Sequence, residues 1–250
     1  MLNAERHKLI MDLLKRKGTV KLKNLIEVSD SSESTIRRDL AELENLGVLK
    51  RVHGGAILNQ SRTIEMSMLE KSVRNVQEKK RIARLAASTV VDGDCIYLDA
   101  GSTTFEMIDF LVGRDITVVT NGLMHVEELV NLDLNAYILG GKMKAKTKAI
   151  IGGIALDNIM NYRFDKAFIG ANGIHMTDGY TTPDMEEALL KRRSMELSDE
   201  TFIVADTSKL HHSHFAKMFD LEEAVLITNG MNEEEKLSLM KKTSVMEVLD

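Results

Sequence analysis

The first sixty residues carry apolar side chains at the three- and four-residue spacing of short amphipathic helices. The pattern predicts a first helix over about 3–17, which Gly18 ends. A second short helix follows, and a third begins at the capping candidates Ser31 and Ser32 and ends at Gly47. The predicted buried faces of the three helices are Leu9, Ile10, Leu13 and Leu14, then Leu22, Leu25 and Ile26, and then Ile36, Leu40 and Leu43.

A different pattern follows the third helix. Residues 48–58 have the sequence VLKRVHGGAIL, in which a β-rich run, a Gly54-Gly55 turn and a second apolar run predict a hairpin. Three short helices and a hairpin make a winged helix-turn-helix, a fold that places one helix in the major groove of DNA. The residues expected to face DNA are Ser34, Thr35, Arg37 and Arg38 on the third helix and Lys50, Arg51, His53 and Gly54 on the hairpin.

The chemistry of these residues suits DNA. Small polar and Arg side chains at the N-terminal end of a helix reach base edges. Basic side chains on a hairpin contact phosphates, and glycine lets the backbone approach closely. The alternative for Arg37 and Arg38 is a solvated helix face with an ion pair such as Arg38 with Glu42. Their position between a turn and a basic hairpin favours the DNA interpretation.

Charge is unevenly distributed along the chain. The whole sequence has 33 Lys and Arg, 38 Asp and Glu, and a formal net charge of −5. Residues 1–58 contain 11 of these bases and 8 of the acids, a net charge of +3, which leaves 22 bases and 30 acids, a net charge of −8, in the remainder. By count alone this is ordinary scatter in surface charge. Together with the arrangement of the bases, it indicates a small part that meets a polyanion and a larger part that does not.

Several segments resemble a known family. ERHKLIMDLL, SESTIRRDLAELENLGVLKRVHGGA and several later segments resemble the DeoR family of bacterial sugar-metabolism repressors over nearly the whole chain. In that family the TIRRDL helix and the RVHGGA hairpin belong to the domain that binds operator DNA. The resemblance implies DNA contacts for the residues of these two motifs. Asp39 belongs to the first motif, and we expect it to cap or pair within its own domain.

The pattern changes again beyond residue 58. Residues 59–77 are strongly polar without strand alternation and predict a linker that leads into a helix. From residue 78 onward, apolar β-runs alternate with helical patterns, which indicates an α/β domain over 78–250 with a parallel sheet covered on both faces. The predicted strands are Asp94–Leu98, Ile116–Thr120, Ala136–Leu139, Lys166–Ile169, Phe202–Ala205 and Ala224–Ile227.

The residues that follow these strands are small, polar or basic. Ligands of open α/β sheets bind beyond the carboxyl ends of the strands. The runs DAGSTTFE, TNG, GGK, GANG and ADTSK should therefore meet at one edge. Hydroxyl and backbone N–H groups at a helix start, as in GSTT, hold a phosphate well, although simple N-capping explains any one such turn. Five together predict a shallow site for a small polar anion, while GANG and GGK complete neither a dinucleotide fingerprint nor a P-loop.

This second domain resembles the sensor domain of the same family, which is similar in fold to ribose-5-phosphate isomerase and glucosamine-6-phosphate deaminase. The resemblance implies a phosphorylated sugar as ligand. Lys142 and Lys146 are candidates to offset its phosphate charge, but the expectation for both is an ordinary surface lysine. The motif match places Asp99, Gly101, Ser102, Thr103 and Thr104 around the ligand and, less specifically, Asn121, Gly141, Gly170, Asn172, Glu187, Lys191 and Lys209.

An isomerase of this fold is the main alternative. Sugar-phosphate isomerisation needs a carboxylate base near the substrate carbon, and Glu187 in TTPDMEEALLKR is the candidate. Similar isomerases have an acidic DGAD-like turn where this chain has IGANGI, with Asn172 in place of an acid. We therefore expect no enzyme activity and assign Glu187 to hydrogen bonds with sugar hydroxyls. His211 and His214 in HHSH lack accompanying ligands and predict an exposed loop rather than a metal site.

The sequence as a whole predicts a ligand-controlled repressor. The winged domain is expected to bind double-stranded operator DNA as a homodimer or larger symmetric assembly. A phosphorylated ketohexose on the second domain shifts the equilibrium between DNA-competent and incompetent states, through the linker and the helix over about 79–91. The form of the DNA-binding motif favours fructose 1-phosphate, with tagatose 6-phosphate next. An activator, or a DNA-binding protein without a ligand, stays open.

The remaining features concern the compartment. Cys95 is the only cysteine, so the chain cannot form an internal disulfide, and no Cys/His ligand set is present. The N-terminal stretch lacks the apolar core of a signal peptide, and no run of roughly 18 apolar residues predicts a membrane span. We expect a cytoplasmic protein that needs no metal or cofactor apart from its sugar effector.

Overall fold

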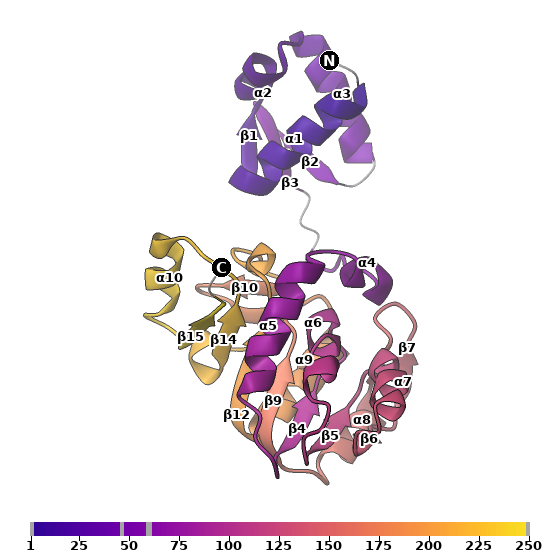
Figure 1. Ribbon diagram of the computed structural model, residues 1–250. Helices are drawn as coiled ribbons and strands as arrows, with labels where there is room; N and C mark the ends of the chain where they lie inside the picture. The colour runs from indigo at the N-terminus through magenta and orange to yellow at the C-terminus, as the bar shows by residue number, and fades with distance from the viewer. Residues whose placement is uncertain (1–2, 46–47, 59–61, 249–250) are drawn as a thin grey trace. The chain divides into compact units, whose positions relative to one another are not determined.

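The chain folds into two compact units. The computed structural model describes residues 3–45, 48–58 and 62–248. Contacts divide the chain into Met1–Ser61 and Arg62–Asp250 (Figure 1). Each unit has its own hydrophobic core. Within the described residues, no helix is long and apolar enough to span a membrane.

The first unit is a three-helix domain with a three-stranded sheet. Its helices are α1 (Asn3–Lys17), α2 (Leu22–Ser29) and α3 (Glu33–Asn45), and its strands are β1 (Thr19–Lys21), β2 (Leu49–Val52) and β3 (Gly55–Leu58) in the order β1-β3-β2. The three predicted helices and the hairpin are confirmed, and Gly18 ends α1 with φ 68°. The sequence did not predict β1, since three residues are too short for a periodic signal. The predicted helix end at Gly47 lies outside the described residues.

The core of this unit contains most of the apolar residues that the helical pattern selected, with Leu13, Leu22 and Ile26 partly buried at its edge and Leu9 outside it. Helix α1 contributes Ile10 and Leu14, and the buried face of α3 carries Ile36, Leu40 and Leu43. Removing such side chains from water is the main stabilising contribution in a domain this small. The winged helix-turn-helix therefore follows from a regular pattern of buried positions.

The two glycines of the hairpin have different tasks. Gly54 has φ +85°, a left-handed conformation that glycine adopts without strain. Gly55 lies against β1, where an added Cβ would come within 2.1 Å of the Val20 carbonyl oxygen. The turn was predicted from the glycine pair, but the close approach to β1 follows only from the tertiary structure.

A seven-stranded parallel sheet forms the centre of the second unit. Its strand order is β15-β14-β12-β9-β4-β5-β6, and every pair is parallel. All six predicted strands are present, with ends shifted by a few residues, and β15 is an addition at the sheet edge. The seven strands are β4 (Cys95–Leu98), β5 (Thr117–Thr120), β6 (Ala136–Ile138), β9 (Phe164–Ile169), β12 (Ser198–Val204), β14 (Val225–Thr228) and β15 (Val245–Glu247).

Helices cover both faces of this sheet (Figure 1). Ile96 and Leu98 of β4 pack in one core with α5 (Val76–Ser88). Tyr97, between them in sequence, packs in the other core with α8 (Gly153–Ile159) and α9 (Met185–Glu196). Successive strand side chains point to opposite faces, so a strand buried on both sides is apolar at every position. The remaining helices are α4 (Met68–Ser72), α6 (Ser102–Phe105), α7 (Leu123–Asn131) and α10 (Glu233–Leu239), with 3-10 turns at Ile108–Phe110, Thr207–Lys209 and Leu221–Glu223.

Smaller antiparallel elements flank the parallel sheet. They are the hairpin β7 (Lys142–Lys144) with β8 (Ala149–Ile151), and a sheet of β10 (Gly173–His175), β11 (Gly179–Thr182) and β13 (Ala216–Phe219). The sequence did not predict them, because strands of three or four residues are too short to be distinguished from loops. They lie in segments that follow predicted strands. The hairpin strand β7 carries Lys144, which belongs to the charged network described below.

The predicted linker 59–77 differs from the structure. Residues 59–61 lie outside the described residues, and the second unit begins at Arg62. Ser67 and Glu70 form a capping box at the start of α4, and the Met68 N–H donates to the Lys146 carbonyl. Glu65 and Met68 are buried. Residues 62–77 therefore pack as part of the second unit, because their few apolar and charged side chains find partners there that a polar composition does not reveal.

Candidate functional site

The N-terminal part of α3 presents polar side chains. Ser34, Arg37 and Arg38 are exposed and Thr35 is half-buried, while Ile36 on the opposite face is fully buried. The Ser32 hydroxyl accepts a hydrogen bond from the Thr35 N–H at 3.3 Å, so Ser32 acts as the cap that the sequence predicted. Its Oγ also lies 2.8 Å from the Thr35 Oγ1.

The two adjacent arginines have different surroundings. Arg37 forms an ion pair with Glu33 one turn earlier, with Nη2 2.7 Å from the carboxylate oxygen. The Arg38–Glu42 pair considered from the sequence is not formed, since the Glu42 carboxylate accepts from the Asn3 amide and lies 3.5 Å from the His7 ring. Within the described residues, Arg38 has no ion-pair partner. Arg38 is thus an exposed cation on this face that forms no ion pair with a carboxylate in the part of the chain that the structure describes.

Asp39 pairs within its own unit, as predicted. Its two carboxylate oxygens accept hydrogen bonds from the Arg6 guanidinium at 2.7 and 3.0 Å. Asp39 is 2% exposed, and Arg6 lies on α1. This two-point contact fixes α3 against α1 and so sets the direction of the arginines beside it.

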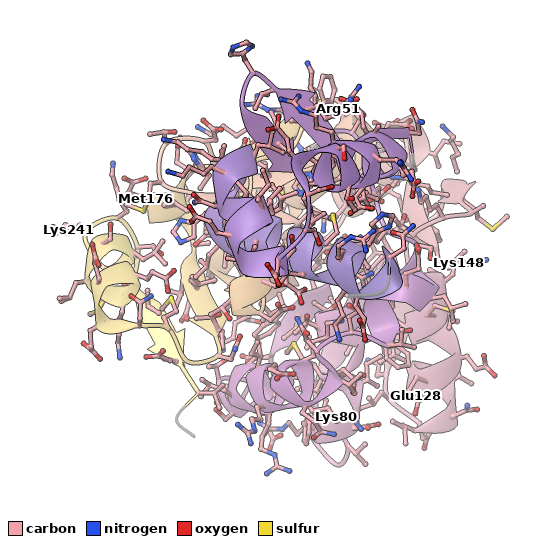
Figure 2. All side chains as sticks on the ribbon, turned by 90° about the horizontal axis from the view of Figure 1, so that it is seen from above. Arg51, Lys80, Glu128, Lys148, Met176 and Lys241 are labelled. Atoms are coloured by element: carbon pink, nitrogen blue, oxygen red, sulfur yellow. The ribbon has the colours of Figure 1, made fainter. Side chains whose placement is uncertain are left out.

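The hairpin carries further exposed cations. Lys50, Arg51, His53 and Gly54 are all exposed, and Figure 2 shows Arg51 on this hairpin. The Arg51 Nε donates to the Glu44 carboxylate at 2.6 Å, and its backbone N–H donates at 2.8 Å. These hydrogen bonds lower the pKa of Glu44 below its ordinary value. Glu44 therefore ties the hairpin to α3, and Arg51 has a structural partner in addition to its exposed surface.

Asp99 and Lys191 form a buried ion pair at the carboxyl edge of the parallel sheet. Asp99 follows β4, Lys191 lies on α9, and they are 2% and 6% exposed. The Lys191 Nζ donates to the Asp99 carboxylate and to the Gly170 carbonyl, while the Gly170 N–H donates to Asp99 at 3.1 Å. The structure thus brings together three residues that the sequence predicted from three separate segments.

The predicted phosphate cradle divides into structural and exposed parts. The Thr104 Oγ1 donates within the turn, to the Asp99 and Gly101 carbonyls, and accepts from the Gly101 N–H at 3.0 Å. Thr104 is fully buried and holds the turn together. Ser102 and Thr103 begin α6, and their hydroxyls make no side-chain hydrogen bond within the described residues. These two residues keep donors for a ligand.

Two other predicted residues hold loops in place. The Asn121 side chain accepts from the Ala100 N–H at 2.9 Å and donates to the Ile150 carbonyl at 3.0 Å, joining the ends of two strands. Gly141 has φ +152°, and an added Cβ would come within 2.8 Å of the Ile151 carbonyl oxygen. Both residues therefore shape the strand-end loops through contacts within the protein.

Asn172 and Lys209 lie at further strand ends. The Asn172 amide oxygen accepts from the Thr182 hydroxyl at 3.1 Å. Lys209 interacts with buried Asp206, whose carboxylate accepts from the Asn75 amide at 2.9 Å. Burial alone would raise the pKa of Asp206, but Lys209 and these hydrogen bonds hold it below its ordinary value. Asp206 is therefore a carboxylate at neutral pH.

Glu187 belongs to a charged network that the sequence did not predict. The Lys144 Nζ lies 2.6 Å from Glu65, 2.9 Å from Asp184 and 3.1 Å from Glu187. The Thr147 hydroxyl donates to Glu187 at 2.7 Å. Burial alone would raise the pKa of Glu187, but Lys191, Thr147 and Lys144 lower it. Glu187 is therefore a carboxylate that accepts hydrogen bonds from Thr147 and Lys144.

Lys144 is the lysine of its hairpin that faces this network. From the sequence, Lys142 and Lys146 were instead the candidates to offset the phosphate charge of a ligand. Lys142 pairs with the partly exposed Glu186 at 3.0 Å and is itself 68% exposed, which fits the expected surface lysine. The three lysines stand at alternate positions, and the carboxylates that select Lys144 come from distant segments, so no sequence signal distinguished them.

Two more lysines come from the segment around α4 and α5. Burial lowers the pKa of Lys79 to about 8 against the opposing effect of Asp206. Burial also lowers the pKa of Lys71, although Glu187 and Glu65 raise it. The positive charges of Lys191 and Lys209 lower the pKa of Lys71 further. Lys71 and Lys79 thus lie on two helices, α4 and α5, that both contact α6, where Ser102 and Thr103 stand first. Ammonium groups and hydroxyls are donors that suit an anion.

The histidine run has separate partners. The His211 Nε2 lies 2.9 Å from a Glu235 oxygen, and the His214 Nδ1 lies 3.3 Å from the Arg62 carbonyl. Within the described residues, one group of three possible metal ligands occurs elsewhere, at His7, Asp39 and Glu42. Because Arg6 already engages both Asp39 oxygens, that group is an ion-pair network.

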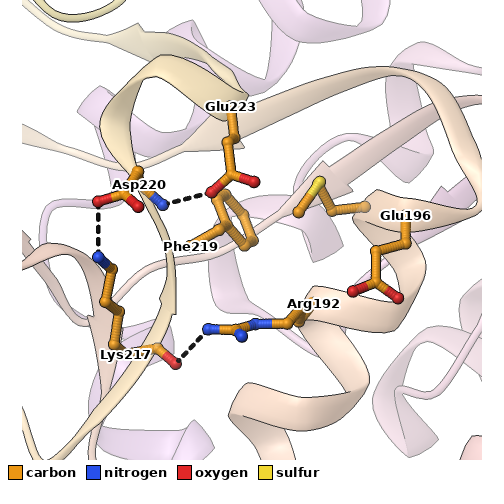
Figure 3. A pocket seen from close by; sticks show the side chains of 7 residues that line it. Arg192, Glu196, Lys217, Phe219, Asp220 and Glu223 are labelled. Atoms are coloured by element: carbon orange, nitrogen blue, oxygen red, sulfur yellow. Dashed lines mark hydrogen bonds and ion pairs between the residues drawn. The ribbon is translucent and has the colours of Figure 1, made fainter.

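A surface pocket of about 420 Å³ lies apart from the strand-end residues (Figure 3). Its lining includes Arg192, Lys217 and Asp220, and none of the predicted ligand-binding residues. The Arg192 Nε donates to the Met218 carbonyl at 2.6 Å, and Lys217 pairs with Asp220 at 2.6 Å. The predicted ligand site and this pocket are therefore different places on the second unit.

Together, the two units define a transcriptional regulator with a DNA-binding part and a sensor part. Residues 6–62 match the DeoR-like helix-turn-helix domain, and residues 74–231 match the DeoR C terminal sensor domain. The chain belongs to the DeoR family, as its motifs indicated. It is a helix-turn-helix DNA-binding regulator and not an enzyme.

Similar proteins extend along nearly the full length of the chain. It is 47% identical over 234 residues to the uncharacterized HTH-type transcriptional regulator FruR of Bacillus subtilis (strain 168), covering 93% of both chains. It is 34% identical over 232 residues to the lactose phosphotransferase system repressor of Staphylococcus epidermidis, covering 91% of this chain and 92% of that one. Among solved structures, ribose 5-phosphate isomerase A of Methanocaldococcus jannaschii matches 54% of this chain and 55% of its own, at 19% identity and a TM-score of 0.42.

Proposed function

We propose that this regulator represses a sugar-utilisation operon and that a phosphorylated sugar releases it from operator DNA. The observation that carries the proposal is that α4 and α5, which carry Lys71 and Lys79, both contact α6, whose first residues are the donors Ser102 and Thr103. A cluster of cations and hydroxyl groups beside buried carboxylates matches a ligand with one phosphate and several hydroxyls. The relative named as a lactose phosphotransferase system repressor supports a sugar-linked role.

The DNA-binding role rests on the exposed polar face of the first unit. Ser34, Thr35, Arg37 and Arg38 are proposed to enter the major groove, where arginine recognises guanine. Lys50, Arg51, His53 and Gly54 are proposed to contact the flanking phosphates. Two copies of the domain on a symmetric operator match a homodimer or larger assembly. Because operator DNA of bacteria lies in the cytoplasm, we propose that the regulator is a cytoplasmic protein.

The effector-binding role divides the strand-end residues by chemistry. Ser102, Thr103 and the lysines Lys71, Lys79, Lys191 and Lys209 are proposed to hold the phosphate. Asp99 and Glu187 are proposed to accept hydrogen bonds from sugar hydroxyls, with Asn172 beside them. Asn121, Gly101, Thr104, Gly141 and Gly170 give the loops their shape.

Fructose 1-phosphate is the proposed effector, and tagatose 6-phosphate is the second candidate. The likeness to the regulator named FruR supports the first, and the likeness to the lactose phosphotransferase system repressor supports the second. Both sugars are phosphorylated ketohexoses with similar hydroxyl sets. The effector must bind one state of the protein better than the other, or it shifts nothing.

Thermal unfolding with a panel of ligands tests the proposal. Fructose 1-phosphate, tagatose 6-phosphate, fructose 6-phosphate, ribose 5-phosphate and inorganic phosphate are each added at saturating concentration. A ligand that binds only the folded chain stabilises it by about 2.7 kcal/mol at one hundred times its Kd. We expect fructose 1-phosphate to raise the melting temperature most and to lower operator affinity in a DNA titration.

The other outcomes are equally clear. A rise with tagatose 6-phosphate alone would replace the first effector by the second. No rise with any of these sugars, together with unchanged operator affinity, would contradict a sugar-phosphate sensor.

The pH dependence of effector binding should follow Lys79. Its ammonium has a pKa of about 8 and faces Asp206, Lys209, Lys71 and Glu106. From pH 7 to pH 9 its charged fraction falls from about nine-tenths to about one-tenth, so phosphate affinity should fall roughly tenfold. Isothermal titration of the bound sugar phosphate at both pH values measures the change.

Without ligand, the contribution of Lys79 to the free energy of unfolding should rise with pH, whereas the phosphate affinity falls. The pKa of Lys79 is lower in the folded chain than the ordinary value of 10.5. Between about pH 8 and 10.5 the unfolded chain therefore holds more protons at this group, and its contribution to stability rises with pH. Lys79→Met should abolish both trends. Equal pH profiles for wild type and Lys79→Met would exclude Lys79 from the phosphate site.

A further inference from the structure

The segment that opens the second unit is held by few buried side chains. Residues 62–67 form no helix or strand, and α4, which follows them, is five residues long. Among residues 62–75, Glu65 and Met68 alone are buried, at 7% and 6% exposure, and Leu69 is 77% exposed. Segments with few buried apolar contacts open at a low cost in free energy. One of the two buried anchors of this segment is therefore a charged group.

Glu65 lies between two lysines of the candidate site. The Lys144 Nζ lies 2.6 Å from the Glu65 Oε2, and the Lys71 Nζ lies 3.8 Å from the Glu65 Oε1. The Oε1 atom is buried and has no hydrogen-bond partner within the described residues. A buried acceptor without a hydrogen bond is costly in free energy. The carboxylate of Glu65 is therefore only partly stabilised where it lies.

Two other carboxylates contact Lys144, and both are held more firmly than Glu65. Asp184 accepts a hydrogen bond from the Glu187 N–H at 3.0 Å and caps α9, and Glu187 accepts from the Thr147 hydroxyl at 2.7 Å. Their hydrogen bonds and nearby lysines lower the pKa of Asp184 and of Glu187. Burial and the charge of Glu187 raise the pKa of Glu65. Among these three, Glu65 is the carboxylate that its surroundings stabilise least as an anion.

An anionic ligand at the candidate site needs the ammonium groups that Glu65 occupies. Lys71 lies on α4, which contacts α6, the helix that Ser102 begins. Lys144 pairs with Glu187, whose pKa Lys191 also lowers. A phosphate monoester carries about −1.5 to −2 charges at pH 7. Such a ligand repels a carboxylate that stays beside it, and the least stabilised carboxylate is the one that leaves.

We propose that Glu65 is an internal competitor for the anion, and that a phosphorylated ligand displaces it from Lys71 and Lys144. Residues 62–72 then lose one of their two buried anchors and are released from the second unit. In sequence, only residues 59–61 separate this segment from β3 of the DNA-binding unit. The inference rests on the proposed function, from which it takes its anion, and it names the contact through which that ligand acts on the chain.

Isothermal titration of the full chain with inorganic phosphate tests the competition. Glu65→Gln keeps the size of the side chain and removes its charge, so phosphate should bind about tenfold more tightly than to wild type. Glu70→Gln is the matched control, because it removes one negative charge from the same segment and glutamine also forms a capping box with Ser67. The control should bind phosphate like wild type. A carboxylate that only supported the site would have the opposite effect, and its loss would weaken phosphate binding.

Hydrogen exchange measures the release of the segment. The reporter is the Met68 N–H, which donates to the Lys146 carbonyl at 2.9 Å. It should exchange faster in Glu65→Gln without phosphate, and in wild type with phosphate, than in wild type alone. The second comparison needs no substitution and therefore does not depend on how the variant folds.

The results separate this inference from the proposed function. Tighter phosphate binding by Glu65→Gln, with faster exchange at Met68, would support the internal competitor. Equal or weaker binding by Glu65→Gln than by Glu70→Gln, or a Met68 exchange rate in wild type that bound phosphate does not raise, would overturn the inference and leave the sensor role intact. A wild type that bound neither phosphate nor any sugar of the panel would contradict both.

Discussion

Lys191→Met is expected to destabilise the second unit by about 3–5 kcal/mol and to remove its response to a sugar phosphate. The substitution leaves the Asp99 carboxylate buried, with the Gly170 N–H as its remaining hydrogen-bond donor among the described contacts. Removing one partner of a buried ion pair costs about this much, since the other charge stays in a medium of low polarity. Urea unfolding of the full chain measures the stability. Ligand titration well below the melting temperature measures the response.

Lys142→Met is the matched control for this substitution. Lys142 also pairs with a carboxylate, but both partners of its pair with Glu186 are largely exposed. Such pairs contribute about 0–1 kcal/mol, so the control should unfold almost like wild type. Replacing both members of the buried pair, with Asp99→Leu and Lys191→Met together, should recover part of the lost stability. If Lys191→Met unfolded at the same urea concentration as the control, the buried pair would not have the role assigned to it.

Arg38→Ala is expected to weaken operator binding by about 1–3 kcal/mol and to relax its sequence preference. Arg38 is exposed beside the N-terminal turn of α3 and has no ion-pair partner within the described residues. Arg37→Ala should cost less, because Arg37 must first give up its ion pair with Glu33. Fluorescence anisotropy with operator and random DNA at one fixed salt concentration compares the variants.

The comparison of the two DNAs decides what Arg38 recognises. A loss on operator DNA that exceeds the loss on random DNA identifies a base contact, and equal losses identify a phosphate contact. Lys8→Ala, an exposed lysine on α1, removes the same charge from another helix and controls for net charge. If Arg38→Ala weakened binding no more than Lys8→Ala, α3 would not be the helix that reads the operator.

The amino-acid sequence determined the elements of both units. Buried positions three and four apart specify α1 and α3, and Gly18 ends α1 where a left-handed residue is needed. Runs of apolar β-formers specify six strands of the parallel sheet. These signals are local and repeated, so they can be read without knowing what each element contacts.

The sequence also predicted a ligand site at the carboxyl edge of the sheet, but not all of the charged residues that the fold brings together there. Asp99, Gly170 and Lys191 were predicted from separate segments, and the fold joins them in one hydrogen-bonded group. Lys144 was missed in favour of its neighbours. Glu65 and Lys71 were assigned to a linker because their segment is polar and has no periodic pattern.

The tertiary structure alone decided these last assignments. A charged side chain becomes part of a buried network only when distant segments bring it a partner of opposite charge. The type of a residue and its neighbours in sequence do not reveal that partner. Glu65 meets Lys144 across 79 positions of sequence, and Asp99 meets Lys191 across 92. The sequence thus determined the two domains and their class. The packing of α4, the β7–β8 hairpin and α9 decided which charges share the site, because burial makes the pairing of charges obligatory there.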